Sequence, residues 1–157
     1  MMSQTDQAAR RRYAVVLGLL LLAFLFRVVS QLVQLWRPVA WLPPFEAWHS
    51  GALPYPILVL AQILILAVGL WCIVRIAQGR MRPNSSAGRV LLVLGWIYFA
   101  VMAVRLVLGL TVLDHVRWFH APLPSFFHLV LASIVLTLAS FHLRERMNAD
   151  LRPSAIG

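Results

Sequence analysis

Four long apolar stretches, separated by short polar or proline-rich segments, dominate the hydropathy pattern of the chain. They cover residues 13–36, 55–75, 90–113 and 125–142. Each has close to the roughly 20 apolar residues that a helix needs to cross a bilayer, and a helix satisfies its own backbone hydrogen bonds within the lipid. The pattern therefore predicts an all-α fold, an integral-membrane four-helix bundle over residues 13–142 with tails at 1–12 and 143–157.

The composition supports this assignment and narrows the class of protein. Hydrophobic residues make up 61% of the chain and charged residues 12%, whereas soluble domains are roughly one-quarter charged. A soluble globular protein is therefore excluded. The net charge of +9 would suggest a nucleic-acid partner for a soluble domain. Here the arginines flank the spans, where they face anionic lipid, and we expect no nucleic-acid partner.

The arginines outside the apolar stretches are distributed unevenly between the two sides of the membrane. Ten lie in or beside the two tails and the connection after the second span, against two, Arg37 and Arg117, in the other connections. An excess of positive charge marks the cytoplasmic side, so both termini are predicted to be cytoplasmic. We expect a multi-pass protein of a bacterial-type inner membrane.

The two connections on the opposite, outer side share a composition. Residues 37–54 and 114–124 each contain tryptophan, phenylalanine and proline together with an acid and histidine. Their candidate residues are Glu46, Trp48, His49, Asp114, His115 and His120. Because tryptophan favours the headgroup zone, we expect two aromatic, proline-rich outer loops that lie on the membrane surface.

Two further arginines lie inside the spans. Arg27 and Arg105 are each about fifteen residues into an outward-running helix, which places them at a similar depth at 1.5 Å per residue. An arginine at the centre of a membrane helix costs about 2.5 to 3.5 kcal/mol even on the lenient insertion scale, and such residues mark functional sites. We therefore expect both arginines to line a site.

Helical phase places other polar residues with these arginines, since residues three or four apart share a helix face. Ser30, Gln31 and Gln34 share the face of Arg27, and Tyr98 shares the face of Arg105. Folding the polar faces inward predicts an outward-facing pocket lined by Arg27, Gln31, Gln34, Gln62, Arg105 and His128. The outer loops are predicted to cover it with Glu46, Trp48, His49, Asp114 and His120.

The chemistry of this pocket favours an anionic amphipath. Guanidinium groups form bidentate contacts with phosphate and carboxylate, and the apolar inner half suits acyl or isoprenoid chains. The same polar groups suit the head of a quinone. We therefore expect a membrane lipid or a quinone as ligand. No histidine or carboxylate spacing is diagnostic of hydrolysis, so no catalytic residue is assigned.

A first alternative is a haem or metal site. The fourteen-residue spacing of His128 and His142 resembles that of the two ligand histidines on one helix of the cytochrome b family. His142 has no inner partner histidine in the chain, so the resemblance implies a single outer b-type haem, between His128 and either His115 or His49. Copper or zinc bound by the outer histidines is a related option.

Two other interpretations need no small ligand. In one, Arg27 and Arg105 pair with Glu46 and Asp114, or with glutamine side chains and backbone carbonyls, and only fix the packing of the helices. In the other, the protein is an accessory or assembly subunit of a larger membrane complex, or a homo-oligomer, whose intramembrane polar groups meet a partner helix.

Overall fold

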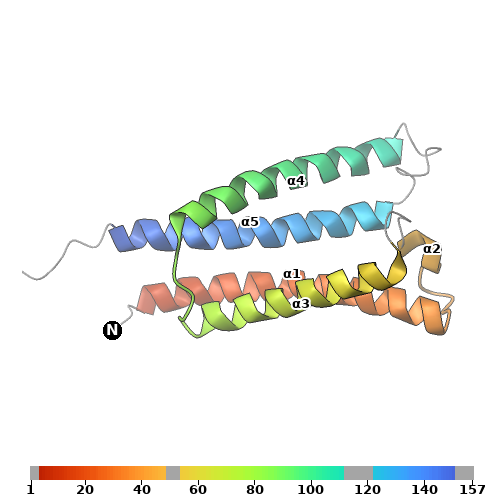
Figure 1. Ribbon diagram of the computed structural model, residues 1–157, viewed down its shortest axis with the longest axis horizontal. Coiled ribbons are helices and arrows are strands. Elements are labelled where there is room, and N and C mark those ends of the chain that lie inside the picture. Colours follow the sequence, from red (N-terminus) through yellow and green to blue (C-terminus); the bar gives the residue numbers. More distant parts are fainter. Residues whose placement is uncertain (1–3, 49–53, 112–121, 151–157) are drawn as a thin grey trace, which may run out of the picture.

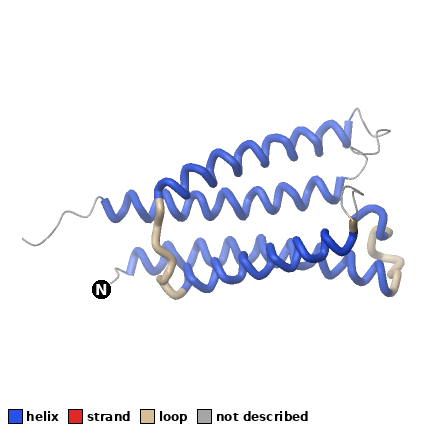
Figure 2. Tube along the Cα trace, viewed as in Figure 1, coloured by secondary structure: helices blue, strands red, loops and turns tan. Residues whose placement is uncertain are grey.

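The computed structural model describes residues 4–48, 54–111 and 122–150, and all the regular secondary structure in these segments is helical (Figures 1 and 2). The helices are α1 (Gln4–Trp36), α2 (Phe45–Trp48), α3 (Tyr55–Ala77), α4 (Ser85–Thr111) and α5 (Pro122–Asp150). All but the one-turn α2 are long and apolar enough to cross a membrane. The structure thus confirms an all-α four-helix membrane bundle.

The helix ends differ from the ends of the apolar stretches for a physical reason. Hydropathy detects only the part of a helix that suits the bilayer. α1 begins nine residues earlier than expected, at Gln4, because the alanines and arginines at positions 8–12 of the expected tail are strong helix formers. α5 begins at Pro122 rather than Ser125, since proline is tolerated in the first turn of a helix.

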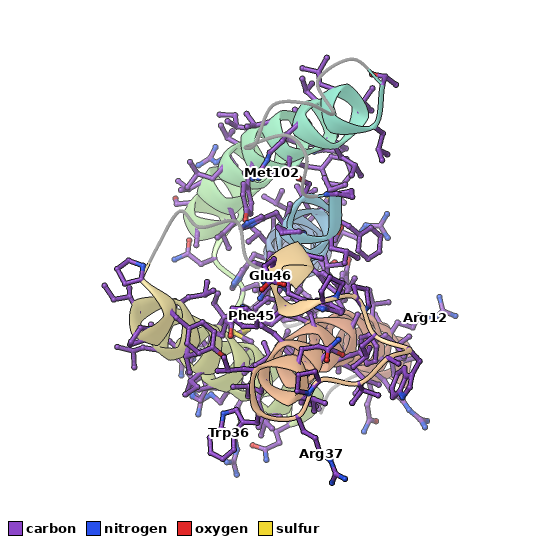
Figure 3. The ribbon with its side chains drawn as sticks, turned by 90° about the vertical axis from the view of Figure 1, so that its right-hand side faces the viewer. Arg12, Trp36, Arg37, Phe45, Glu46 and Met102 are labelled. Carbon is purple, nitrogen blue, oxygen red and sulfur yellow. The ribbon has the colours of Figure 1, made fainter. Side chains whose placement is uncertain are left out.

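The four long helices form a bent row in the order α3, α1, α5, α4 (Figures 1 and 3). α1 packs against α3 and α5, and α5 packs extensively against α4. Over the described parts of the chain, α3 and α4 do not approach each other. α5 is consequently the most enclosed helix, while α3 and α4 expose most of their apolar side chains.

The contact between α4 and α5 depends on small residues. Ala132 and Ala139 of α5 are fully buried, and Gly88 and Gly95 of α4 lie against the same helix. A Cβ atom added at Gly95 would lie 2.8 Å from Cδ2 of Leu136, closer than real Cβ contacts allow. Small residues let two membrane helices approach closely, and here they allow α4 to be held by one neighbour.

The start of α1, the end of α5 and the connection between α3 and α4 lie at one end of the row, which we call the terminal end (Figure 1). α2 lies at the other, the α2 end. The four long helices thus bring the start of α1 and the end of α5 to the same end of the bundle.

Polar contacts hold the terminal end together. Nη2 of Arg10 and Oε2 of Glu145 are 2.8 Å apart, and Nη1 of Arg10 donates to the carbonyl of Met81 at 3.3 Å. The backbone N–H of Asn84 donates to Nδ1 of His142 at 3.2 Å. Arg10, which the sequence suggested only as a lipid-facing charge, therefore joins α1, α5 and the connection after α3.

Candidate functional site

Arg27 of α1 is held near the α2 end of the bundle by contacts with α2 and α5. It projects from α1 and is 7% exposed. Its Nη2 donates to the carbonyl of Trp48 at 3.1 Å, and its guanidinium carbon lies 6.0 Å from the centroid of the Phe127 ring of α5. A neutral carbonyl and an aromatic face thus surround a charge that sits inside an apolar helix bundle.

All the residues of the predicted polar face of α1 are buried, but they make different contacts. These residues are Arg27, Ser30, Gln31 and Gln34. Gln34 does not face a pocket with a free amide. Its Nε2 donates to the carbonyls of Val39, Leu42 and Pro43 at 2.7 to 3.2 Å, and its Oε1 accepts from the Val39 N–H at 2.7 Å. Gln34 therefore anchors the proline-containing segment after α1, where the backbone has few partners of its own.

Gln31, one turn from Arg27, joins α1 to α3. Its Oε1 accepts a hydrogen bond from Nε2 of Gln62 at 3.2 Å. Gln31 is 1% exposed, and its Nε2 has no hydrogen-bond partner among the residues that the structure describes. Because a buried donor without a partner costs about 1 to 3 kcal/mol, this amide is a place where an acceptor from outside the chain would be stabilised.

On the other side of the row, Arg105 of α4 is 5% exposed and lies two turns after Tyr98 on the same face. The Tyr98 hydroxyl and Nδ1 of His128 form a hydrogen bond between α4 and α5. The positive charges of Arg27 and Arg105 both reach His128 electrostatically. His128 is therefore within electrostatic reach of both arginines, and the hydrogen bonds Gln31–Gln62 and Tyr98–His128 connect polar side chains of α1 with α3 and of α4 with α5.

We refer to this group as the arginine cluster. It consists of Arg27, Gln31, Gln62, Tyr98, Arg105 and His128. Five of these residues were candidates from the sequence. Tyr98 was noted only as a neighbour of Arg105, because tyrosine is common in membrane helices and helical phase does not reveal the partner of its hydroxyl. Tyr55 shares a face of the second span with Gln62 but was likewise not expected in the pocket; it interacts electrostatically with Arg27.

Of the residues expected to cover the pocket, Trp48 is buried and Glu46 is exposed. Trp48 is buried, stacks at a tilt on Phe127 with centroids 6.1 Å apart, and donates from Nε1 to the Pro43 carbonyl at 2.9 Å. Glu46 is exposed, and no ion pair joins it to Arg27 within the described segments. His49, Asp114, His115 and His120 lie outside the described residues.

The structure offers limited support for metal binding. Over the described ranges, no three His, Cys, Asp or Glu side chains gather in one place. Nδ1 of His128 is engaged by Tyr98, which would leave Nε2 for a ligand. The histidines proposed as its partners in the haem alternative, His115 and His49, lie in the segments that the structure does not describe.

Comparisons with protein-family models, curated proteins and solved structures give no match to this chain. The class of the protein is therefore defined by its fold and site alone. It is a four-helix membrane protein with two buried arginines in a polar cluster near one end of its helices.

Proposed function

We propose that this protein binds an anionic amphipath, with the phosphate or carboxylate head in the arginine cluster and the apolar chain along the helices. The observation that carries the proposal is the state of Arg27. Its guanidinium is buried and donates to a neutral carbonyl, and no carboxylate in the described parts of the chain pairs with it. A buried charge needs compensation, which an anionic ligand supplies.

The neighbours of Arg27 favour an anion over a neutral quinone. Guanidinium carries five N–H donors in a fork that matches phosphate and carboxylate. The free Nε2 donor of Gln31 lies one turn away, and a second guanidinium, that of Arg105, acts on His128 from α4. Two positive charges and an amide donor form a better environment for a charged acceptor than for the weakly polar carbonyls of a quinone.

The fold also provides a place for an apolar chain. A groove of about 520 Å³ runs along α4, with Val135 of α5 at its edge. Its lining includes Leu91, Leu94, Gly95, Tyr98, Val101 and Val135. Tyr98 belongs to both the groove and the arginine cluster, so the groove begins at the cluster and continues toward the terminal end. A head group in the cluster would leave its chain in this apolar groove.

The uneven distribution of arginines supports a specific orientation. Ten arginines lie in or beside the two tails and the connection after the second span, and by the positive-inside rule we place this side of the protein in the cytoplasm of a bacterial-type inner membrane. The arginine cluster would then lie in the outer half of the bilayer. Reporter fusions after residue 157 and in the 37–54 connection test this orientation, and activity of a cytoplasmic reporter in the 37–54 connection would contradict it.

The binding proposal is tested by the lipid that remains with the purified protein. Native mass spectrometry of the detergent-solubilised wild type is expected to detect a bound anionic amphipath. Arg27→Gln is expected to reduce its retention about tenfold, since a charge-assisted hydrogen bond contributes about 1.5 to 3 kcal/mol. Arg37→Gln removes the same charge from an exposed position at the end of α1 and is the matched control.

Two results would contradict the proposal. One is an unchanged ligand in Arg27→Gln. The other is a wild type without any amphipath that instead purifies in a fixed ratio with another membrane protein, which would favour the accessory-subunit interpretation.

A further inference from the structure

A second groove lies at the terminal end, between α1 and α5. It has a volume of about 560 Å³. Its lining consists of Ala9, Arg12, Tyr13, Val16, Thr137, Ser140, Arg144, Glu145 and Met147. Arg12 projects from the side of α1 that faces away from α3 (Figure 3). The groove therefore opens on that side of α1.

The charged part of the groove is positive. Arg12 and Arg144 are both exposed at its rim. Its one carboxylate, that of Glu145, already forms the 2.8 Å ion pair with Arg10 and so does not neutralise the rim. The Tyr13 hydroxyl donates to the Ser140 carbonyl at 3.4 Å and lies beside Arg144. Two guanidinium groups from different helices therefore flank one opening.

The deeper part of the groove is within the membrane-spanning helices. Val16 lies one turn, about 6 Å, beyond Arg12 on the same face of α1. Thr137 lines the same depth on α5, and its hydroxyl donates to the Ser133 carbonyl at 2.7 Å, so it offers little polarity. The groove thus changes from cationic to apolar over one or two helical turns.

A second depression adjoins this groove on the exposed side of α1, also at the terminal end. It has a volume of about 600 Å³ and shares Arg12 and Val16 with the groove. Arg11 adds a third positive charge, and Val15 adds apolar surface. On the combined surface the cationic groups Arg11 and Arg12 are followed, one helical turn deeper, by Val15 and Val16.

From this geometry we infer that the terminal end binds one anionic phospholipid of the adjacent leaflet. Arg12 and Arg144 hold its phosphate, one acyl chain lies between α1 and α5, and the second lies along α1 at Val15. The occupant is a lipid rather than a free phosphate because the cationic rim continues into an apolar groove inside the spans. This site lies at the opposite end of the helices from the arginine cluster and does not depend on the proposed function.

The test uses the full chain in nanodiscs that contain phosphatidylcholine and phosphatidylglycerol. Native mass spectrometry after release from the disc is expected to show one retained phosphatidylglycerol beyond any amphipath at the arginine cluster. The double variant Arg12→Gln/Arg144→Gln is expected to weaken this retention about tenfold, since paired guanidinium contacts to phosphate are lost. Arg80→Gln/Arg82→Gln removes two exposed arginines at the same end, away from the groove, and is expected to change retention less than about twofold.

The outcomes separate the alternatives. An equal loss in both double variants overturns the site in favour of general electrostatic attraction, and full retention in Arg12→Gln/Arg144→Gln overturns it outright. Displacement of the lipid by soluble glycerol 3-phosphate would identify a phosphate site rather than a lipid site. Circular dichroism confirms that each variant keeps its helices. Arg27→Gln is expected to leave this lipid in place, which distinguishes the two sites.

Discussion

Arg27 and Trp48 are joined by a hydrogen bond from the Arg27 guanidinium to the Trp48 carbonyl, at 3.1 Å across 21 residues of chain. Trp48 ends the short helix α2, and its ring packs on Phe127 of α5 beneath the same guanidinium. The buried arginine thus fixes how the chain returns over the α2 end of the bundle. One neutral carbonyl does not compensate the full positive charge of the buried Arg27 guanidinium.

Replacing Arg27 with an apolar residue is expected to separate its binding role from its structural role. Arg27→Met removes a buried charge and keeps the side-chain length, but it leaves the buried Trp48 carbonyl without its donor. We therefore expect a loss of about 1 to 3 kcal/mol in the free energy of unfolding in detergent, together with loss of the bound anionic amphipath. A large fall in stability with the ligand retained would show that Arg27 acts only in packing.

Gln34 is expected to be a stability residue rather than a ligand residue. Gln34→Leu deprives the Val39, Leu42 and Pro43 carbonyls and the Val39 N–H of their partner. With about 1 kcal/mol for each net hydrogen bond, we expect a loss of about 2 to 4 kcal/mol and faster proteolysis between α1 and α2. Gln7→Leu, at an exposed site of α1, is the control, and equal stability of the two variants would contradict the anchor.

Gly95 is expected to control the packing of α4 on α5. In Gly95→Leu the side chain would meet Leu136 and Val135, which lie 2.8 to 3.3 Å from the position of a Cβ atom. Overpacking typically costs about 1 to 3 kcal/mol, and among the helices that the structure describes α4 packs on α5 alone. Gly18→Leu is the matched control, since nothing lies within 4 Å of its added Cβ.

Thermal unfolding and cysteine crosslinking between α4 and α5 measure this effect. Gly95→Leu is expected to lower both the unfolding temperature and the crosslinking yield relative to Gly18→Leu. Equal behaviour of the two variants would show that α4 is not held through its glycines.

The ion pair between Arg10 and Glu145 at the terminal end is expected to stabilise the bundle only when both residues are present. Glu145→Gln leaves the partly buried Arg10 without its carboxylate, and removing one partner of such a pair costs more than removing both. We expect Glu145→Gln to lose about 1 to 3 kcal/mol and Arg10→Gln/Glu145→Gln to recover part of it. A double-mutant cycle in unfolding free energy measures this coupling, and strict additivity of the two changes would refute it.

The fold and the arginine cluster were predictable to different degrees. Hydropathy sufficed for the four spans, because the bilayer imposes a length and an apolar composition on each span separately. The polar face of α1 was also predictable, because helical phase alone places Arg27 and Gln31 together. The engagement of Gln34 was not predictable, because its partners are backbone carbonyls, which leave no trace in residue identity.

The order in which the helices pack was also not predictable from the sequence. A pattern of four apolar spans is compatible with a closed bundle in which every polar face points to a central pocket. The small residues Gly88, Gly95, Ala132 and Ala139 let α4 approach α5 closely. Among the described helices, α4 packs on α5 and α3 packs on α1. Short-range steric fit decides this pairing, since apolar surface in lipid has no preference for one apolar neighbour over another.

The sequence by itself therefore determined the class of protein, the four spans and the two arginines placed within them, because each follows from the cost of polar groups in a bilayer. The tertiary structure decided which helices touch, that the charges of both Arg27 and Arg105 act on His128, and that Trp48 packs at the α2 end. These depend on side-chain packing and on hydrogen bonds to the backbone between residues far apart in the chain, which no local pattern records.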